Sequence, residues 1–344
     1  MLTTSWLLAA LAVALAWPVP VLLSRATWPS RSPVAAMILW QGVALAGGLS
    51  MIGAFLTWGL APAGHGLVPA LIDFAAAVVG GRPFPELTLI HVFALSVAGL
   101  LSIQLLLTLL RSAWRLRRHR MQHRSMLALL ARSHSDTTHP GTLVIEHATP
   151  AAYCLPGSGS VTVLTSGLIG ELSPAELRAV LAHESAHLTQ RHDLLLLAFT
   201  SWQAALPWLP TTRLALTAVA ELVEELADDA AMKTSSRTDL LGALAVVAAG
   251  AAPAQAGGTQ VPDATVPGPT SSGTESSNTG PSGSTPVPDT LQGSLSETLS
   301  SARLQRLFNP APPLPTWASV TVVAGGVALV AAPTAALLAT GWGA

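Results

Sequence analysis

The residues best suited to chemistry lie in the stretch HESAH, residues 183 to 187. On an α-helix, residues four apart share one face, so His183 and His187 would lie side by side with Glu184 next to them. Two imidazoles at this spacing hold one Zn²⁺ ion, and the carboxylate can act as a general base. The spacing therefore predicts His183 and His187 as metal ligands and Glu184 as the catalytic residue. His192 would lie about 140° round the helix from His187, which argues against it as a ligand.

A catalytic zinc ion needs a third protein ligand and one open position. The chain has a single cysteine, so we expect a carboxylate from the downstream stretch AELVEELADDAA. At helical spacing Glu224 pairs with Asp228, and Glu225 pairs with Asp229. Helical geometry alone does not choose between these two pairs, and the pair that points away would form a solvated acidic face.

The helix that carries the histidines has a clear predicted start. Ser173 is a candidate N-cap, Pro174 suits the first helical position, and Glu176 completes a capping box. Two strand-like runs precede this helix, at residues 142–147 and 161–165, and predict a small sheet. One of them could present its edge to an extended substrate.

The composition points to a membrane. Half of the residues are hydrophobic and only 10% are charged, against about 25% charged residues in an average soluble domain. Four segments are long and apolar enough to cross the hydrocarbon layer, at residues 6–23, 34–60, 87–110 and 318–338. The first could instead be a signal peptide, but it lacks a positively charged start and we favour an anchor. The apolar run 194–210 is short and predicts a buried or partly embedded helix rather than a full span.

Arginines predict the orientation of these spans, because loops rich in Lys and Arg stay in the cytoplasm. Six follow the third span, namely Arg111, Arg115, Arg117, Arg118, Arg120 and Arg124. The loop after the first span holds Arg25 and Arg31, whereas residues 61–86 hold only Arg82. We therefore expect the N- and C-termini outside and the histidine helix in the cytoplasm. The net charge of −1 argues against direct binding of nucleic acid.

These observations divide the chain into five predicted units. Residues 251–300 are rich in Ser, Thr, Gly and Pro, which predicts a disordered insert because such a segment buries too little apolar surface to fold. The units are a three-span membrane unit at 1–110, a cytosolic zinc metallopeptidase domain at 111–250, the insert at 251–300, a juxtamembrane segment at 301–316 and a fourth transmembrane helix at 317–344.

The arrangement resembles the M56 family, the antibiotic-sensor metallopeptidases of the gluzincin group. The resemblance rests on the three spans before the histidines, the run from AYCLPG to HESAHLTQRHD, and VEELADDAA. It implies a mostly α fold of membrane helices with a gluzincin-type zinc peptidase unit, in which the HExxH helix packs with a small β-sheet. It also implies Glu224 as the third ligand and Asp228 as the partner of a ligand histidine. The chain departs from that family because it lacks the C-terminal penicillin-binding sensor domain.

The resulting expectation is a membrane-embedded zinc endopeptidase at the cytoplasmic membrane face. The resemblance suggests regulatory proteolysis or signal transduction, through cleavage of a transcriptional repressor or self-cleavage near RLQRL. The alternatives are a quality-control protease of the similar M48 type, and a non-catalytic membrane transducer with a vestigial metal site. The expected partners are a protein or peptide substrate and the lipid bilayer.

Overall fold

The fold is described from a computed structural model that covers residues 1–63, 66–81, 87–131, 142–155, 161–256 and 301–339. Most of the predicted insert at 251–300 lies outside these residues. The elements in chain order are α1 (Leu2–Ala16), α2 (Pro18–Ser24), η1 (Pro29–Arg31), α3 (Pro33–Gly59), η2 (Ala61–Ala63), α4 (Leu67–Val79), α5 (Leu89–Ala131), β1 (Thr142–Ile145), β2 (Ala152–Leu155), β3 (Val161–Thr165), α6 (Ser166–Glu171), α7 (Pro174–Thr189), α8 (His192–Ala205), α9 (Pro210–Ala231), α10 (Arg237–Ala256), α11 (Ser301–Phe308) and α12 (Thr316–Ala339).

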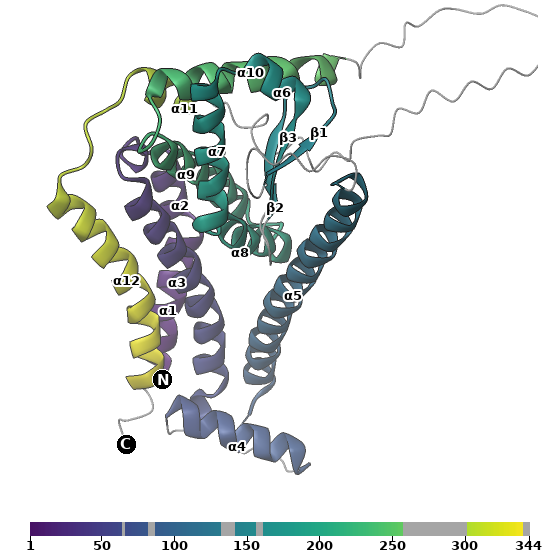
Figure 1. Ribbon diagram of the computed structural model, residues 1–344. Helices are drawn as coiled ribbons and strands as arrows, with labels where there is room; N and C mark the ends of the chain where they lie inside the picture. Colours follow the sequence, from purple (N-terminus) through teal and green to yellow (C-terminus); the bar gives the residue numbers. More distant parts are fainter. Residues whose placement is uncertain (64–65, 82–86, 132–141, 156–160, 257–300, 340–344) are drawn as a thin grey trace, which may run out of the picture.

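Four helical segments of the described chain are long and apolar enough to cross a membrane. They are Leu2–Ser24, which joins α1 and α2, then Pro33–Gly59, Leu89–Gln122 and Thr316–Ala339. The start of α1, the end of α12 and α4 lie at one end of this helical bundle, and the sheet with α6, α7, α10 and α11 lies at the other (Figure 1). The prediction of a mostly helical fold with four apolar spans is confirmed.

Helix α3 packs between α1 and α12 and is the most buried of the four spans. The two helices approach closely at Gly42 of α3, where an added Cβ atom would lie 2.5 Å from the backbone oxygen of Gly326 in α12. Small residues at such crossings let two apolar helices approach closely where the lipid offers no hydrophobic drive for association. A larger residue at position 42 would therefore force α12 away from α3.

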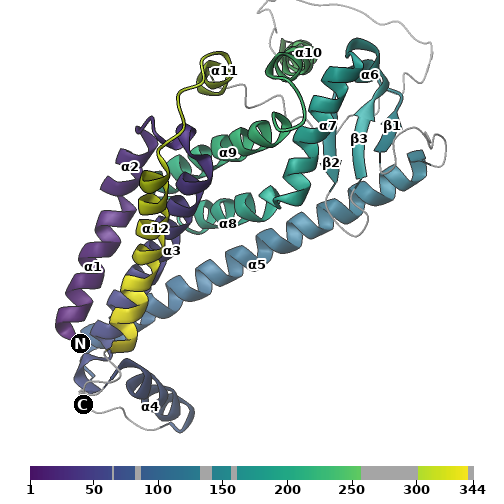
Figure 2. The ribbon, with the colours of Figure 1, turned by 60° about the vertical axis from the view of Figure 1, so that its left-hand side comes forward.

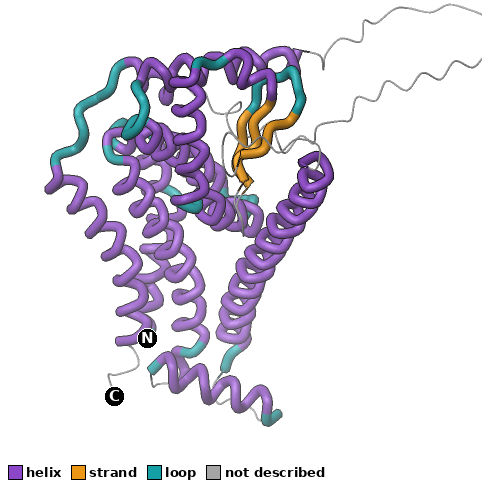
Figure 3. The backbone as a smooth tube through the Cα atoms, viewed as in Figure 1, coloured by secondary structure: helices purple, strands orange, loops and turns teal. Residues whose placement is uncertain are grey.

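The sheet has three short strands in the order β1-β3-β2 (Figure 3). β1 pairs with β3 in parallel, and β2 pairs with β3 antiparallel. Sequence patterns predicted strands at β1 and β3 but missed β2, whose four residues AYCL lack the run of β-branched residues seen in TLVI and VTVLT. Because β3 is the central strand, the run 161–165 has no free edge in the described sheet, and the outer strands are β1 and β2.

Helix α7 begins as its sequence predicts. The Ser173 side chain accepts a hydrogen bond from the backbone N–H of Glu176, and the Glu176 carboxylate accepts one from the backbone N–H of Ser173. The helix ends at Thr189, and Arg191 adopts a left-handed conformation with φ of 50°. The chain therefore turns before His192 and starts a new helix there.

The apolar run after His192 forms α8, which is not among the candidate spans in the described part of the chain. Together with α9 it packs against the membrane helices (Figure 2). Phe199 of α8 and Val219 of α9 share a buried apolar cluster with Trp40 of α3. The helices around the predicted catalytic residues are thus anchored directly on the spans.

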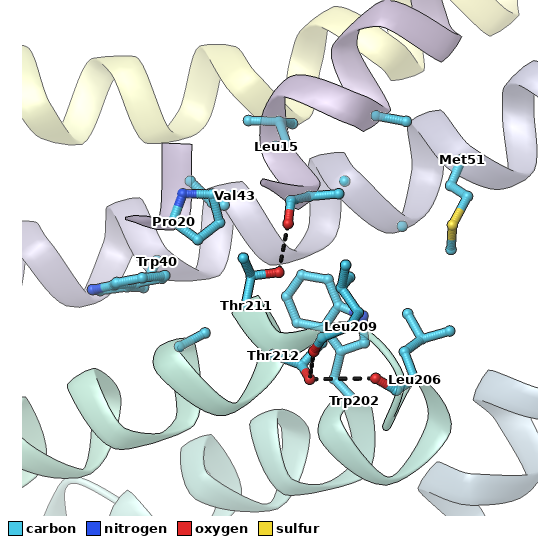
Figure 4. A pocket seen from close by; sticks show the side chains of 15 residues that line it. Leu15, Pro20, Trp40, Val43, Met51, Trp202, Leu206, Leu209, Thr211 and Thr212 are labelled. Carbon is cyan, nitrogen blue, oxygen red and sulfur yellow. Dashed lines mark hydrogen bonds between the residues drawn. The ribbon is translucent and has the colours of Figure 1, made fainter. Parts of the chain in front are cut away.

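A small cavity of about 30 Å³ marks this contact between α1, α3, α8 and α9 (Figure 4). Trp202, Val43 and Leu15 supply much of its apolar wall. Beside it the hydroxyl of Thr211 donates a hydrogen bond to the backbone oxygen of Ala16, which ties the start of α9 to the end of α1. The cavity is apolar and lies far from the histidines along α9.

Candidate metal and catalytic site

Helices α7 and α9 pack side by side and bring together the two histidines and a glutamate. The Nε2 atoms of His183 and His187 lie 3.2 Å apart. The Glu224 carboxylate oxygens lie 3.5 Å from Nε2 of His183 and 3.6 Å from Nε2 of His187. All three potential ligand atoms therefore lie within 4.8 Å of one another, which is the spacing that a single metal ion requires.

The neighbouring Glu225 is also buried, but it is not part of this group. Burial raises the pKa of Glu225 to about 7, partly opposed by the positive charge of Arg306 and supported by the negative charge of Asp229. The structure therefore separates the two acidic pairs that helical spacing left open. Glu224 lies against the histidines, and Glu225 has Arg306 and Asp229 as electrostatic neighbours.

Asp228 lies one helical turn after Glu224 and contacts the far side of His183. Its Oδ1 atom lies 3.0 Å from Nδ1 of His183, and both side chains are 1% exposed. Burial alone would lower the pKa of His183, but the carboxylates of Asp228 and Glu224 outweigh it and raise that pKa to about 9. A carboxylate on Nδ1 also fixes the orientation of the imidazole and directs Nε2 towards Glu224 and His187.

Glu184 is buried beside the histidines and faces strand β2. Burial raises the pKa of its carboxyl group to about 7, although the nearby His183 and the amide and thiol of Cys154 oppose the shift. The Oε1 atom of Glu184 is buried and has no hydrogen-bond partner among the described residues. A carboxylate with a pKa near neutrality, and with one oxygen that has no hydrogen-bond partner among the described residues, is suited to accept a proton from a reacting water.

Two groups that the sequence did not connect to the site also contact it. The first is His192, whose Nδ1 atom lies 3.1 Å from Nδ1 of His187, while its Nε2 atom lies 3.1 Å from Oε1 of Gln190. Extending the α7 helix had placed His192 away from His187, but the left-handed turn at Arg191 brings it back. His192 does not belong to the group of potential ligands. It can instead hold the ring of His187 from the side opposite Nε2.

The second is Arg303 of α11, which is 3% exposed. Its Nε and Nη2 atoms donate hydrogen bonds of 2.7 Å each to the two carboxylate oxygens of Asp228. Its Nη1 atom lies 3.1 Å from Oε2 of Glu224. The sequence offers one signal for this contact, because acidic residues that become buried need a cation nearby. From the sequence, the basic stretch RLQRL is assigned to a possible self-cleavage site instead. In the structure it is helical, and Arg303 and Leu307 are buried.

The thiol of Cys154 gives a test of the surroundings of Glu184. Burial, followed by the negative charge of Glu184, raises the pKa of Cys154 to about 12. Since only the thiolate reacts with iodoacetamide, we expect alkylation at pH 8 to be at least about 100-fold slower than for a free thiol of pKa near 8.5. The rate should rise as the pH increases towards 12.

Mass spectrometry can follow this reaction because the chain has one cysteine. Free glutathione in the same tube is the reference thiol. Alkylation of Cys154 at the rate of glutathione would contradict the half-buried, Glu184-facing position of the thiol.

The donor set fits a zinc ion. Two imidazole nitrogens and one carboxylate, with a further position left for water, are typical of catalytic zinc sites. The unpartnered oxygen of Glu184 lies beside this set rather than in it. The residues present are thus compatible with a zinc ion and a reacting water.

Comparison with known families is consistent with this chemistry. Residues 116–284, just under half of the chain, match the model of Peptidase family M48. No curated protein and no solved structure matches the chain. The match includes α7, α8 and α9 and begins within α5.

The match corrects the predicted resemblance to the M56 family, which is wrong. Both groups share HExxH and a downstream glutamate–aspartate pair, so these motifs do not separate them, and the number of preceding spans was a weak criterion. Peptidases of the M48 family are zinc-dependent. With its four apolar helices, the chain is a membrane zinc endopeptidase. The reason to expect a repressor substrate or signal transduction is lost with the M56 resemblance.

Proposed function

We propose that this membrane zinc endopeptidase holds its metal ion through His183, His187 and Glu224, and that Glu184 is its catalytic base. The observation that carries this proposal is the convergence of three ligand atoms within 4.8 Å of one another. A zinc ion held by these residues would activate a water molecule and polarise the carbonyl group of a peptide bond. The protein's own residues supply the remaining steps.

Glu184 acts first as a general base and then as a general acid in this proposal. Its Oε1 atom accepts the proton of the attacking water, and the same carboxyl group then donates it to the nitrogen of the leaving amine. The pKa of about 7 allows both transfers near neutral pH, because the group is neither strongly acidic nor strongly basic there. Asp228 and His192 hold the rings of His183 and His187 in place through their Nδ1 atoms.

We propose that β2, rather than β1 or β3, binds the substrate. β2 is an outer strand of the described sheet, and it packs against α7. Its Cys154 lies against Glu184, so the strand passes directly beside the proposed base. An extended polypeptide that pairs with an outer strand gains backbone hydrogen bonds irrespective of its sequence. This supports an endopeptidase that cleaves unfolded or extended segments of proteins.

We place the catalytic site on the cytoplasmic side. Arg111, Arg115, Arg117 and Arg118 are exposed on the part of α5 that leads to the sheet, and such basic segments remain in the cytoplasm. The start of α1 and the end of α12 lie at the opposite end of the bundle, so both termini would be outside. Alkaline phosphatase fused after Ala344 should be active and a fluorescent protein fused there dark. The reverse result would contradict this orientation.

Metal removal tests the catalytic proposal. Purified protein in detergent, treated with a chelator and then dialysed, should lose cleavage of an unfolded protein such as casein, and stoichiometric Zn²⁺ should restore it. Zinc content is measured by atomic absorption in the same samples. Protein that binds zinc but cleaves none of several unfolded substrates would favour the non-catalytic transducer with a structural metal.

A further inference from the structure

Helix α11 brings the buried guanidinium group of Arg303 to the proposed metal site from a distant part of the chain. It lies outside residues 116–284, the segment that matches the family model. Arg303 binds both oxygens of Asp228 at 2.7 Å and approaches Oε2 of Glu224 to 3.1 Å. The planar guanidinium group is well matched to such a paired arrangement, because its donors form a rigid fork.

The contacts of Arg303 act on two proposed ligands at once. Glu224 is contacted directly, so its carboxylate is fixed with Oε2 between Arg303 and His183 and with Oε1 towards His187. His183 is reached through Asp228, whose Oδ1 atom contacts both Nη2 of Arg303 and Nδ1 of His183. One side chain thus sets the positions of ligands on two different helices, α7 and α9.

Helix α11 is itself held by several contacts. Arg306 donates to both carboxylate oxygens of Asp229 at 2.7 and 2.8 Å, and its Nε atom donates to the backbone oxygen of Ser30 at 2.8 Å. Leu307 is 1% exposed and packs in the apolar cluster that includes Val180 of α7 and Leu244 of α10. These contacts prevent α11 from drifting away from α9.

We propose that Arg303 is a positioning residue that holds Glu224 and, through Asp228, His183 in the geometry that binds zinc. This inference rests on the proposed ligand set. In this proposal the fork of the guanidinium group matters in addition to its charge, and a lysine would supply the same charge without the fork. The proposal therefore predicts a difference between arginine and lysine at this position.

The test measures zinc affinity of the full-length protein in detergent by competition with a chromophoric chelator. Arg303→Met removes the charge and the fork, and Arg303→Lys keeps only the charge. We expect zinc affinity to fall by about 10- to 100-fold for Arg303→Met, the range typical of residues that support metal ligands, and by a smaller but clear factor for Arg303→Lys. Arg178→Met, at an exposed position of α7, is the matched control and should bind zinc like the wild type.

A variant of Arg303 could lose zinc affinity because it does not fold or because its ligands are no longer held in position, so the two causes must be separated. Circular dichroism of each variant with excess chelator reports whether the metal-free protein is folded. If Arg303→Met does not fold, Arg303→Lys decides the matter, because its charge still compensates the buried carboxylates.

A folded Arg303→Met or Arg303→Lys variant with zinc affinity within about twofold of the wild type would overturn the proposal. A double variant, Arg303→Met with Asp228→Asn, tests charge balance directly. Recovery of wild-type affinity in it would show that only charge matters and would also overturn the proposal. If the wild type itself binds no zinc, the proposed ligand set fails instead, so the two failures are distinguishable.

Discussion

Replacing Glu184 with glutamine will remove peptide-bond hydrolysis and leave zinc binding intact. The amide cannot accept the proton of water, and general base catalysis contributes about 10²- to 10⁴-fold to the rate, so we expect kcat to fall by at least about 100-fold. Glu184 lies beside the ligand group and does not belong to it. The zinc content should therefore match that of the wild type, because no proposed ligand changes.

The measurement compares cleavage of casein and zinc content for the same preparations. Glu171→Gln, at an exposed position at the end of α6, is a control for the loss of one negative charge in the same domain. Equal cleavage by wild type and Glu184→Gln, with zinc present in both, would disprove the assignment of the base. A parallel loss of zinc and activity would show instead that Glu184 supports the metal.

Alanine at position 224 will remove the zinc ion, whereas alanine at position 225 will not. Glu224 supplies the only carboxylate in the group of ligand atoms among the described residues, and two imidazoles alone make a weak site. We expect the zinc affinity of Glu224→Ala to fall by more than about 100-fold, beyond the effect typical of supporting residues.

Glu225→Ala is the matched comparison because it changes the adjacent residue of the same helix. Burial raises the pKa of Glu225 to about 7, so its carboxyl group is partly neutral at pH 7 and its loss removes little charge. Zinc affinity near that of the wild type is expected. Zinc loss in Glu225→Ala with retention in Glu224→Ala would reverse the assignment of the third ligand.

The sequence was informative wherever local periodicity decided the structure. The capping box at Ser173 and Glu176 predicted the start of α7, and the spacing of His183 and His187 predicted a shared face on it. Apolar length predicted the four spans. Each of these inferences depends on contacts within a few residues along the chain, which are the contacts that a sequence pattern reports.

The features of the site that the sequence did not predict depend on contacts between residues that are distant in sequence or on unusual backbone conformations. His192 returns to His187 because Arg191 adopts a left-handed conformation that non-glycine residues seldom take. Arg303 meets Asp228 across 75 positions of sequence. Glu224, rather than Glu225, lies against the histidines because of how α9 is rotated against α7, and that rotation is set by tertiary packing. The family was misassigned because the shared motifs describe the chemistry of the site and not the protein around it.

The contact between α11 and α9 can form only late in synthesis, because α11 follows α9 in the chain. The residues proposed to bind zinc are complete once α9 has been made, but the arginine that neutralises Asp228 follows only with α11. A chain that stops before residue 301 would contain every proposed ligand but would lack the guanidinium group that contacts Asp228 and Glu224. Under the proposal that Arg303 positions these ligands, zinc would bind at full affinity only after α11 has been added. A fragment that ends before residue 301 would then bind zinc more weakly than the full chain.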